Sequence, residues 1–172
     1  MEFDETSVKI DLEASVINHR KDKRYIKIGR NSWLRGQILI CKHGGEVSIG
    51  EDCFIGENSR IWSAARIVIG NRVLISHNVN IHDNSSHSLD SKERHLEYLA
   101  IKNDNVLLDN LKIGEAEIII EDDAWIGFNC TILKGVTVGR GAIIGANSII
   151  TRDVEPYSVM VGNPSKIIKY TT

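Results

Sequence analysis

The chain has 172 residues, a length that suits one domain with a continuous core. Its formal net charge is −2 at pH 7, so its charge gives no reason to expect a nucleic-acid partner. No apolar run approaches the ~20 residues of a membrane-spanning helix, and we expect no membrane span.

Residues 1–27 are predicted to form an N-terminal cap. Their acidic start, MEFDETSVKIDLE, lacks the basic and then apolar layout of a signal peptide, so we expect none. Apolar residues alternate weakly at Val8, Ile10 and Leu12, and the charged run HRKDKR follows. Because such a run is typical of a solvated turn, we expect a starting strand that leads through a turn into the next segment.

Residues 28–82 carry an aliphatic residue at almost every sixth position, with interruptions. The spacing begins at Ile28, Leu34 and Ile40, and it slips at residues 43–45 and again at residues 67–68. Between the slips it is regular, and its aliphatic residues are Ile49, Ile55, Ile61, Ile69, Ile75 and Ile81. Slim residues follow four positions later, which predicts a stack of repeats.

Residues 118–154 repeat the pattern without interruption. The aliphatic residues are Ile120, Ile126, Ile132, Val138, Ile144 and Ile150. A helix needs apolar residues three and four apart, and an isolated strand needs strict alternation. A period of six suits a solenoid in which each hexad forms one short strand and a corner. We therefore predict an all-β fold in which both blocks form coils of one solenoid.

Residues 83–117 separate the two blocks as a long inserted loop. Loops of this length in a compact domain are usually functional or disordered. Its leucines predict that it folds back or packs on another subunit: Leu96, Leu99, Leu107, Leu108 and Leu111. Residues 155–172 contain both prolines of the chain and are predicted to cap the open end of the solenoid.

Five motifs together resemble the hexapeptide-repeat acyltransferases: DDAWIG, ILKGVTVG, IGANSIITRDV, VGNPSKIIK and SHSLDSKER. The resemblance is greatest to the sugar O-acetyltransferases, which include galactoside, maltose and bacterial polysaccharide enzymes. It implies a left-handed parallel β-helix, an acetyl-CoA donor, a carbohydrate acceptor, and a homotrimer with active sites between subunits. The handedness comes from the resemblance alone, because about 98% of crossovers between parallel strands are right-handed. Surface-polysaccharide or glycoconjugate synthesis is the implied pathway.

His87 is the predicted catalytic base. Acetyl transfer to a sugar hydroxyl needs a base because the hydroxyl is a poor nucleophile near neutral pH, and histidine has an unperturbed pKa of about 6.5. His87 lies in SSHSLDSKER, which is similar to the family's catalytic histidine motif. A loop histidine is otherwise usually a solvated side chain, so the assignment depends on the resemblance.

Cysteine usage bears on both the mechanism and the compartment. Three cysteines are an odd number, which argues against a disulfide framework and predicts a reducing, cytoplasmic location. Cys53 and Cys130 occupy inward positions of the repeat. We therefore expect direct transfer in a ternary complex, without an acyl-enzyme.

The resemblance also implies positions for the coenzyme and the acceptor. Residues that match the coenzyme groove and the basic groups for its phosphates are Trp125, Gly127, Phe128, Gly145, Ala146, Thr151, Arg152, Lys166 and Lys169. Phe128 departs from the small residue often found at its position, so it would narrow the groove or stack on the pantetheine arm. The candidates for the acceptor site are Asp83, Asn84, Ser86 and Asn58, although short polar residues beside a bend are more often turn formers.

Three other functions stay open. An N-acetyltransferase for a nucleotide-linked amino sugar would use the same histidine. His77 and His82 are spaced like two zinc ligands of the carbonic anhydrases built from hexapeptide repeats, with His43 as a candidate third ligand. A scaffold without catalysis is the third. Neither zinc chemistry nor a scaffold explains the acyltransferase motifs, so we expect no metal.

Overall fold

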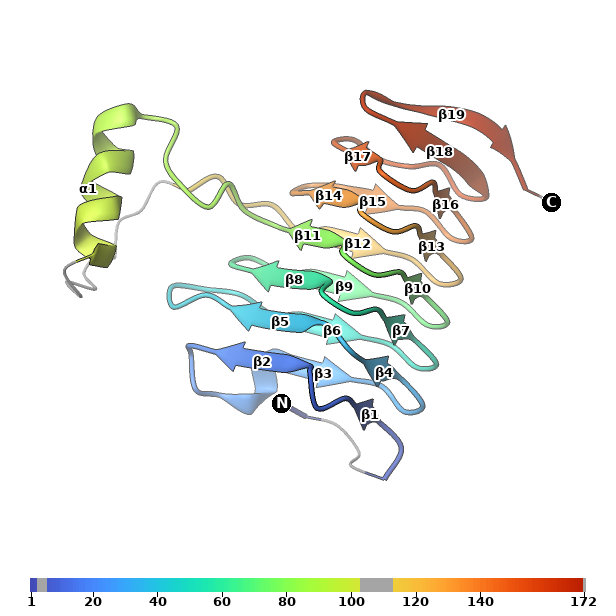
Figure 1. The fold of residues 1–172 in the computed structure, drawn as a ribbon, viewed down its shortest axis with the longest axis horizontal. Helices are drawn as coiled ribbons and strands as arrows, with labels where there is room; N and C mark the ends of the chain where they lie inside the picture. The colour runs from blue at the N-terminus through green and yellow to red at the C-terminus, as the bar shows by residue number, and fades with distance from the viewer. Residues whose placement is uncertain (3–5, 103–112, 172) are drawn as a thin grey trace.

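The computed structural model describes residues 1–2, 6–102 and 113–171. Within these ranges the chain winds into a left-handed parallel β-helix of about six turns (Figure 1), which confirms the predicted fold class. Each turn, or coil, passes in order through three parallel sheets that form the three faces of the solenoid. The described part contains no helix long and apolar enough to cross a membrane.

Face 1 is the largest sheet and contains the only antiparallel pair among the described strands, β18 with β19. Its strands are β1 (Lys9–Ile10), β4 (Trp33–Leu34), β7 (Phe54–Ile55), β10 (Leu74–Ile75), β13 (Trp125–Ile126), β16 (Ile143–Ile144), β18 (Ser158–Gly162) and β19 (Ser165–Tyr170).

Faces 2 and 3 complete the coils. Face 2 consists of β2 (Ser15–Asn18), β5 (Gln37–Ile40), β8 (Arg60–Ser63), β11 (Asn80–His82), β14 (Thr131–Leu133) and β17 (Ile149–Ile150). Face 3 consists of β3 (Ile26–Ile28), β6 (Val47–Ile49), β9 (Ile67–Ile69), β12 (Ile118–Ile120) and β15 (Thr137–Val138). We call the bend from face 1 to face 2 the first corner, and the bend from face 2 to face 3 the second corner.

The core is a set of aliphatic columns that run along the solenoid axis. On face 2, one column pairs the same position of successive coils and contains Ile38, Ile61, Ile81, Ile132 and Ile150, all fully buried. Each such side chain contributes about 1.5–3 kcal/mol when it leaves water. The six-residue spacing arises because consecutive strands lie on different faces and each presents an inward aliphatic residue.

One coil departs from the predicted spacing. The sequence placed Ile40 on the beat after Leu34, whereas the structure pairs Ile38 with Ile61 and Ile40 with Ser63. Two residues, 35–36, join β4 to β5 at the first corner, where four residues join β7 to β8 in the next coil. Both Ile38 and Ile40 of β5 are buried. The spacing of aliphatic residues alone therefore did not show that this corner is two residues shorter.

The segment between β11 and β12 leaves the solenoid and contains a helix, α1 (Ser91–Lys102), which stands away from the coils in Figure 1. We predicted a loop throughout. The helix begins after Asp90, whose side chain accepts hydrogen bonds from the backbone N–H groups of Lys92 and Glu93. Its apolar residues form no continuous buried stripe, which is why periodicity did not reveal it. Leu107, Leu108 and Leu111 lie outside the described residues.

Asp83 anchors the start of this insertion. Its carboxylate accepts hydrogen bonds from the Ser63 hydroxyl at 2.6 Å and from the backbone N–H groups of Ala64 and Ala65 at 2.7 and 3.0 Å. The residue has no exposed surface. A buried carboxylate needs such partners because an unpaired one costs far more than a lost hydrogen bond.

The C-terminal hairpin covers one end of the solenoid. The backbone N–H of Gly162 donates to the Ser148 hydroxyl, and the Arg152 guanidinium donates to the carbonyl oxygen of Ser165. Because β18 pairs with β16 on one side and β19 on the other, the end of face 1 is extended beyond the last regular coil.

Replacement of Ile61 by alanine should lower the free energy of unfolding by about 2–5 kcal/mol, because it removes buried atoms and leaves a cavity in the column. Urea denaturation measures this loss. The control is Ile168→Ala, since Ile168 is 59% exposed. Equal losses in the two variants would contradict the role given to the column.

Replacement of Asp83 by asparagine should lower the free energy of unfolding by about 1–3 kcal/mol, since one oxygen becomes an N–H₂ group that faces N–H donors. The control is Asp52→Asn, an exposed residue with φ of 57°, which asparagine tolerates. Thermal unfolding compares the two. An unchanged midpoint for Asp83→Asn would show that the carboxylate does not anchor the insertion.

Candidate functional site

His87 lies in the loop that leads from β11 to α1. Its Nδ1 is 3.1 Å from Oε2 of Glu97, which comes from the second half of the helix. The His87 side chain is 48% exposed, whereas that of Glu97 is 3% exposed. One imidazole nitrogen is therefore held by a buried carboxyl group while the ring remains open to solvent.

Helix α1 also fixes the backbone beside His87. The Glu97 carboxylate accepts from the backbone N–H of Ser88, and Glu93 accepts from the Ser88 hydroxyl at 2.7 Å. The Arg94 guanidinium donates to the carbonyl oxygen of Ser88 at 2.9 Å. These bonds keep the short loop between Asp83 and the helix in a defined geometry.

Glu97 is a functional candidate that the sequence did not reveal. It is the one buried residue among the side chains of α1 that the structure describes. Glu93 and Glu97 form a like-charge pair four residues apart, which disfavours an isolated helix, and this was the available signal. The contact between Glu97 and His87 could be predicted only if the position of the helix relative to His87 were known.

The pairing defines what His87 can do chemically. A carboxylate only accepts hydrogen bonds, so a neutral ring paired with it is the Nδ1–H tautomer, whose N–H donates a hydrogen bond to Oε2 of Glu97. The lone pair is then on Nε2. An oriented imidazole with a free Nε2 at the protein surface is suited to accept a proton from a bound hydroxyl or amine.

Four residues assigned to the coenzyme lie close together on the first corner. Gly127 and Phe128 follow β13, and Gly145 and Ala146 follow β16 in the next coil. A Cβ atom on Gly127 would lie 2.7 Å from the carbonyl oxygen of Ile144, so the backbones of the two coils meet here. Gly127 is buried, and the Val161 side chain lies against Gly145. We call residues 127–128 and 145–146 the coenzyme strip.

Aromatic residues flank this strip. Phe128 is 42% exposed, and its ring stacks on His77 with centroids 5.2 Å apart and planes 3° apart. Trp125 is 49% exposed and projects from β13 on the outer side of face 1. Phe128 thus already has a stacking partner on the preceding coil.

The remaining coenzyme candidates belong to the C-terminal end. Thr151 and Arg152 follow β17, and Lys166 and Lys169 lie on β19. All four are exposed. The bond from Arg152 to the carbonyl oxygen of Ser165 joins the end of the last coil to the hairpin, so these positive charges lie at the capped end of the solenoid.

Within one chain, His87 and the coenzyme candidates on the first corner lie apart. Residues 127–128 and 145–146 lie on the first corner, whereas the loop with His87 leaves from the second corner. The insertion projects away from the coils in Figure 1. His87 and the coenzyme strip therefore lie on different corners of one chain.

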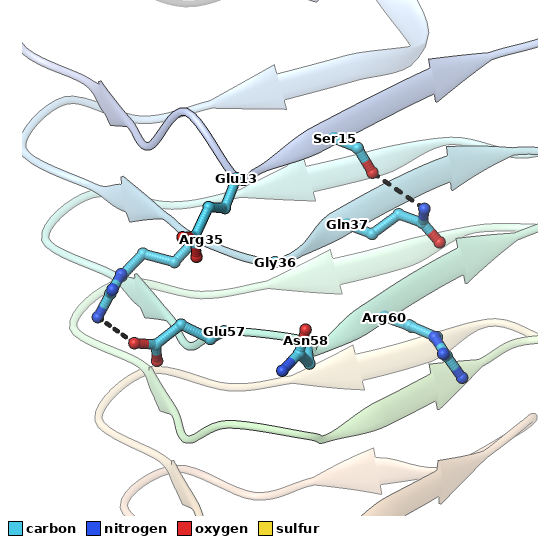
Figure 2. A pocket seen from close by; sticks show the side chains of 8 residues that line it. All are labelled: Glu13, Ser15, Arg35, Gly36, Gln37, Glu57, Asn58 and Arg60. Atoms are coloured by element: carbon cyan, nitrogen blue, oxygen red, sulfur yellow. Dashed lines mark hydrogen bonds and ion pairs between the residues drawn. The ribbon is translucent and has the colours of Figure 1, made fainter.

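The predicted acceptor residues divide into two locations. Asp83 is buried, and its bonds to the backbone give it a structural role. Asn84 donates to Asp83 and accepts from the backbone N–H of Ser86, which has φ of 61°, so both residues shape the turn before His87. Asn58 lies elsewhere, in a cavity on the first corner (Figure 2).

The three histidines considered for zinc do not converge. His82 stacks on Trp62 with centroids 4.9 Å apart, and burial lowers the pKa of its imidazole. His77 stacks on Phe128, and His43 pairs with Glu115 at 2.9 Å. In the described part of the chain, no group of three His, Cys, Asp or Glu side chains could hold a metal ion.

The cysteines are free thiols of low reactivity. Burial raises the pKa of Cys53 and Cys130, and burial together with Asp83 and Glu115 raises the pKa of Cys41 to about 11. The thiolate is the nucleophilic form. None of the three is therefore suited to carry an acyl group.

Comparison with known proteins supports an assignment to a family. The family described as bacterial transferase hexapeptide (six repeats) matches residues 117–152, and that described as hexapeptide repeat of succinyl-transferase matches residues 46–82. A probable macrolide acetyltransferase from Lysinibacillus sphaericus is 53% identical over 55 residues, which are 32% of this chain and 31% of that protein. A chloramphenicol acetyltransferase from Agrobacterium fabrum is 47% identical over 53 residues, 31% of this chain and 25% of that protein. The chain thus spans about a third or less of the length of these relatives.

Solved structures match over more of the chain. A hexapeptide-repeat-containing acetyltransferase from Vibrio cholerae is 29% identical, with a TM-score of 0.65 over 88% of this chain and 76% of its own. The same enzyme complexed with acetyl coenzyme A is 28% identical, with a TM-score of 0.63 over 91% and 71% of the two chains.

A third structure shares the fold alone. A variant of AntD, an N-acyltransferase from Bacillus cereus, was solved with dTDP-4-amino-4,6-dideoxyglucose and coenzyme A. It is 18% identical, with a TM-score of 0.74 over 96% of this chain and 81% of its own. The repeat motifs, the three-faced coil and the two family matches together show that the chain is built from the hexapeptide repeats of bacterial transferases.

Proposed function

We propose that the protein transfers an acetyl group from acetyl-CoA to a hydroxyl group of a sugar, with His87 as general base. The observation that carries the proposal is the imidazole held at Nδ1 by the buried Glu97 and open at Nε2. Direct transfer in a ternary complex fits the raised pKa values of the three thiols. The presence of acetyl coenzyme A in the related Vibrio cholerae structure supports the donor.

The chemistry follows from the orientation of His87. Nε2 takes the proton of the acceptor hydroxyl as its oxygen attacks the thioester carbonyl carbon. Glu97 stabilises the imidazolium that forms, because a carboxylate beside Nδ1–H favours the charged ring. The carbon–sulfur bond then breaks, and the imidazolium returns the proton to the coenzyme thiolate. The ester and free coenzyme A are the products.

We further propose that the enzyme is a homotrimer with an active site at each contact between subunits. The insertion of one copy would place His87 beside residues 127–128 and 145–146 of the next. Exposed apolar side chains on and before α1 support a cover by another copy; they are Leu89, Leu96, Tyr98 and Leu99. Lys166 and Lys169 would meet the coenzyme phosphates. The free thiols fit a cytoplasmic location.

Transfer to an amino group of a nucleotide-linked sugar is the second candidate. The fold likeness to AntD favours it, because that protein was solved with a nucleotide-linked amino sugar. A panel of sugars and amino sugars, with coenzyme A release as the readout, distinguishes the two. Esters form with hydroxyl acceptors and are cleaved by hydroxylamine, whereas amides resist it. Product formation only on amino sugars would replace the primary proposal.

Replacement of His87 by alanine should lower kcat by roughly 10²–10⁴-fold, since proton removal from the acceptor is lost. Binding of acetyl-CoA, measured by calorimetry, should stay within about twofold, because the strip on the first corner is untouched. The control is His95→Ala, an exposed histidine of α1. Unchanged turnover in His87→Ala would exclude His87 as the base.

Replacement of Glu97 by glutamine should lower kcat by about tenfold or more with little change in KM for acetyl-CoA, because the amide no longer fixes the Nδ1–H tautomer. Glu97 is a positioning residue, so the loss should appear in kcat and not in the affinity for acetyl-CoA. The control is Lys92→Gln, an exposed residue of the same helix. An unchanged kcat in Glu97→Gln would contradict the pairing.

A further inference from the structure

The shortened corner between β4 and β5 creates a cavity. Coils are numbered from the N-terminus, so that β4 to β6 form coil 2 and β7 to β9 form coil 3. The first corner has two residues in coil 2 and four in coil 3. The hollow has a volume of about 220 Å³ and is seen in Figure 2. This is below the roughly 300–1,000 Å³ of pockets for drug-sized ligands, which restricts the occupant to one small molecule or ring.

Gly36 forms the floor. A Cβ atom at this position would lie 2.5 Å from the carbonyl oxygen of Ser59, so no larger residue fits without displacement of the backbone. Glycine is therefore required here for the close approach of coils 2 and 3. All other residues that line it are polar or charged: Glu13, Ser15, Arg35, Gln37, Glu57, Asn58 and Arg60.

One wall is a fixed ion-pair network. The Arg35 guanidinium lies 2.6 Å from Asp11. It also lies 2.5 Å from Glu57, as Figure 2 shows. The Trp33 indole N–H, at 2.9 Å, and Arg35 hold the pKa of Asp11 below its usual range. Asp11 is thus charged at neutral pH, and the Arg35 guanidinium is paired with carboxyl groups within the wall.

The opposite wall presents oriented uncharged groups. The Trp62 indole donates to Oε1 of Gln37 at 2.7 Å, and Nε2 of Gln37 donates to the Ser15 hydroxyl at 2.9 Å. The Gln37 amide is therefore fixed in one orientation. Its second N–H and the Ser15 O–H remain available as donors.

Three exposed side chains complete the rim. Within the described residues, the side chains of Glu13, Asn58 and Arg60 form no hydrogen bond or ion pair. Asn58 adopts a φ of 57° at the first corner of coil 3, and its side chain lines the cavity. The rim thus offers one carboxylate, one amide and one guanidinium, which together provide both donors and acceptors.

This composition favours a neutral polyhydroxylated ligand. A phosphate would meet Arg60 but would also face Glu13 and Glu57, and Arg35 is already compensated. An apolar ligand would find no apolar wall. Vicinal hydroxyl groups both donate and accept, so they can satisfy a carboxylate, an amide and a guanidinium at the same time.

We propose that the cavity lined by Glu13, Gly36, Gln37, Asn58 and Arg60 binds one neutral sugar ring. The site is on the first corner, in coils 1 to 3, and does not include His87 or the coenzyme strip. The sugar site rests on the proposed function in one respect only, which is that the bound sugar is part of the carbohydrate acceptor. Binding itself is independent of transfer.

Ligand-observed NMR on the full chain tests the site with glucose, galactose and N-acetylglucosamine, and with glucuronate, glucosamine and inorganic phosphate as charged probes. We expect at least one neutral sugar to bind with a Kd of about 0.1–10 mM, more tightly than each charged probe. Arg60→Ala and Asn58→Gly should each weaken it by about fivefold or more, and glycine preserves the positive φ. Arg66→Ala, at an exposed arginine of the second corner, should leave binding unchanged.

Two outcomes would overturn the proposal. One is the absence of binding by every neutral sugar up to about 30 mM; the other is binding that neither variant weakens while both remain folded by circular dichroism. Preferred binding of phosphate would identify an anion site instead and would also overturn it. Sugar binding should persist in His87→Ala. If wild-type protein binds sugar but releases no coenzyme A, the proposed function fails while the sugar site stands.

Discussion

The structure depends on the register between coils. Every regular face repeats its inward residue in the next coil, so that Ile61 stacks between Ile38 and Ile81 and their strands exchange backbone hydrogen bonds. Parallel strands are about 4.8 Å apart, which brings aliphatic side chains of equal size into contact. A slip by one residue would turn the isoleucines outward. The corners add slim buried residues to the core, such as Val79 and Cys130, yet two of them differ in length from the regular repeat.

The candidate chemistry lies where corners depart from the regular repeat. The second corner of coil 4 is expanded into residues 83–117, and this expansion carries His87 and the helix that orients it. The first corner of coil 2 is contracted, and this contraction opens the cavity above Gly36. Asp83 and the Arg35 network fix the two irregular corners to the coils, because buried or paired carboxylates need defined partners.

The sequence predicted the parts of this protein that depend on periodicity. The beat of residues 118–154 was enough to predict the solenoid, and a motif resemblance added handedness and His87. Periodicity misplaced one residue, Ile40, because Ile38 and Ile40 are both inward in β5. It did not find α1, whose exposed helix has no buried apolar stripe. The sequence also did not reveal the role of Glu97, because its contact with His87 depends on how the helix packs against the preceding loop. The role of His87 as the base and the roles assigned to the coenzyme and acceptor residues remain predictions.

The number of coils also sets distances along the solenoid axis. The cavity above Gly36 and the strip at Gly127 lie on the same corner but at different levels of the stack. Each coil adds about 4.8 Å along the axis, so the number of coils sets the separation of the two places. Deletion of one whole coil between them would shorten that separation by one step and leave each surface intact. Length along the axis is therefore a property that evolution can alter in fixed increments, independently of the chemistry at either level.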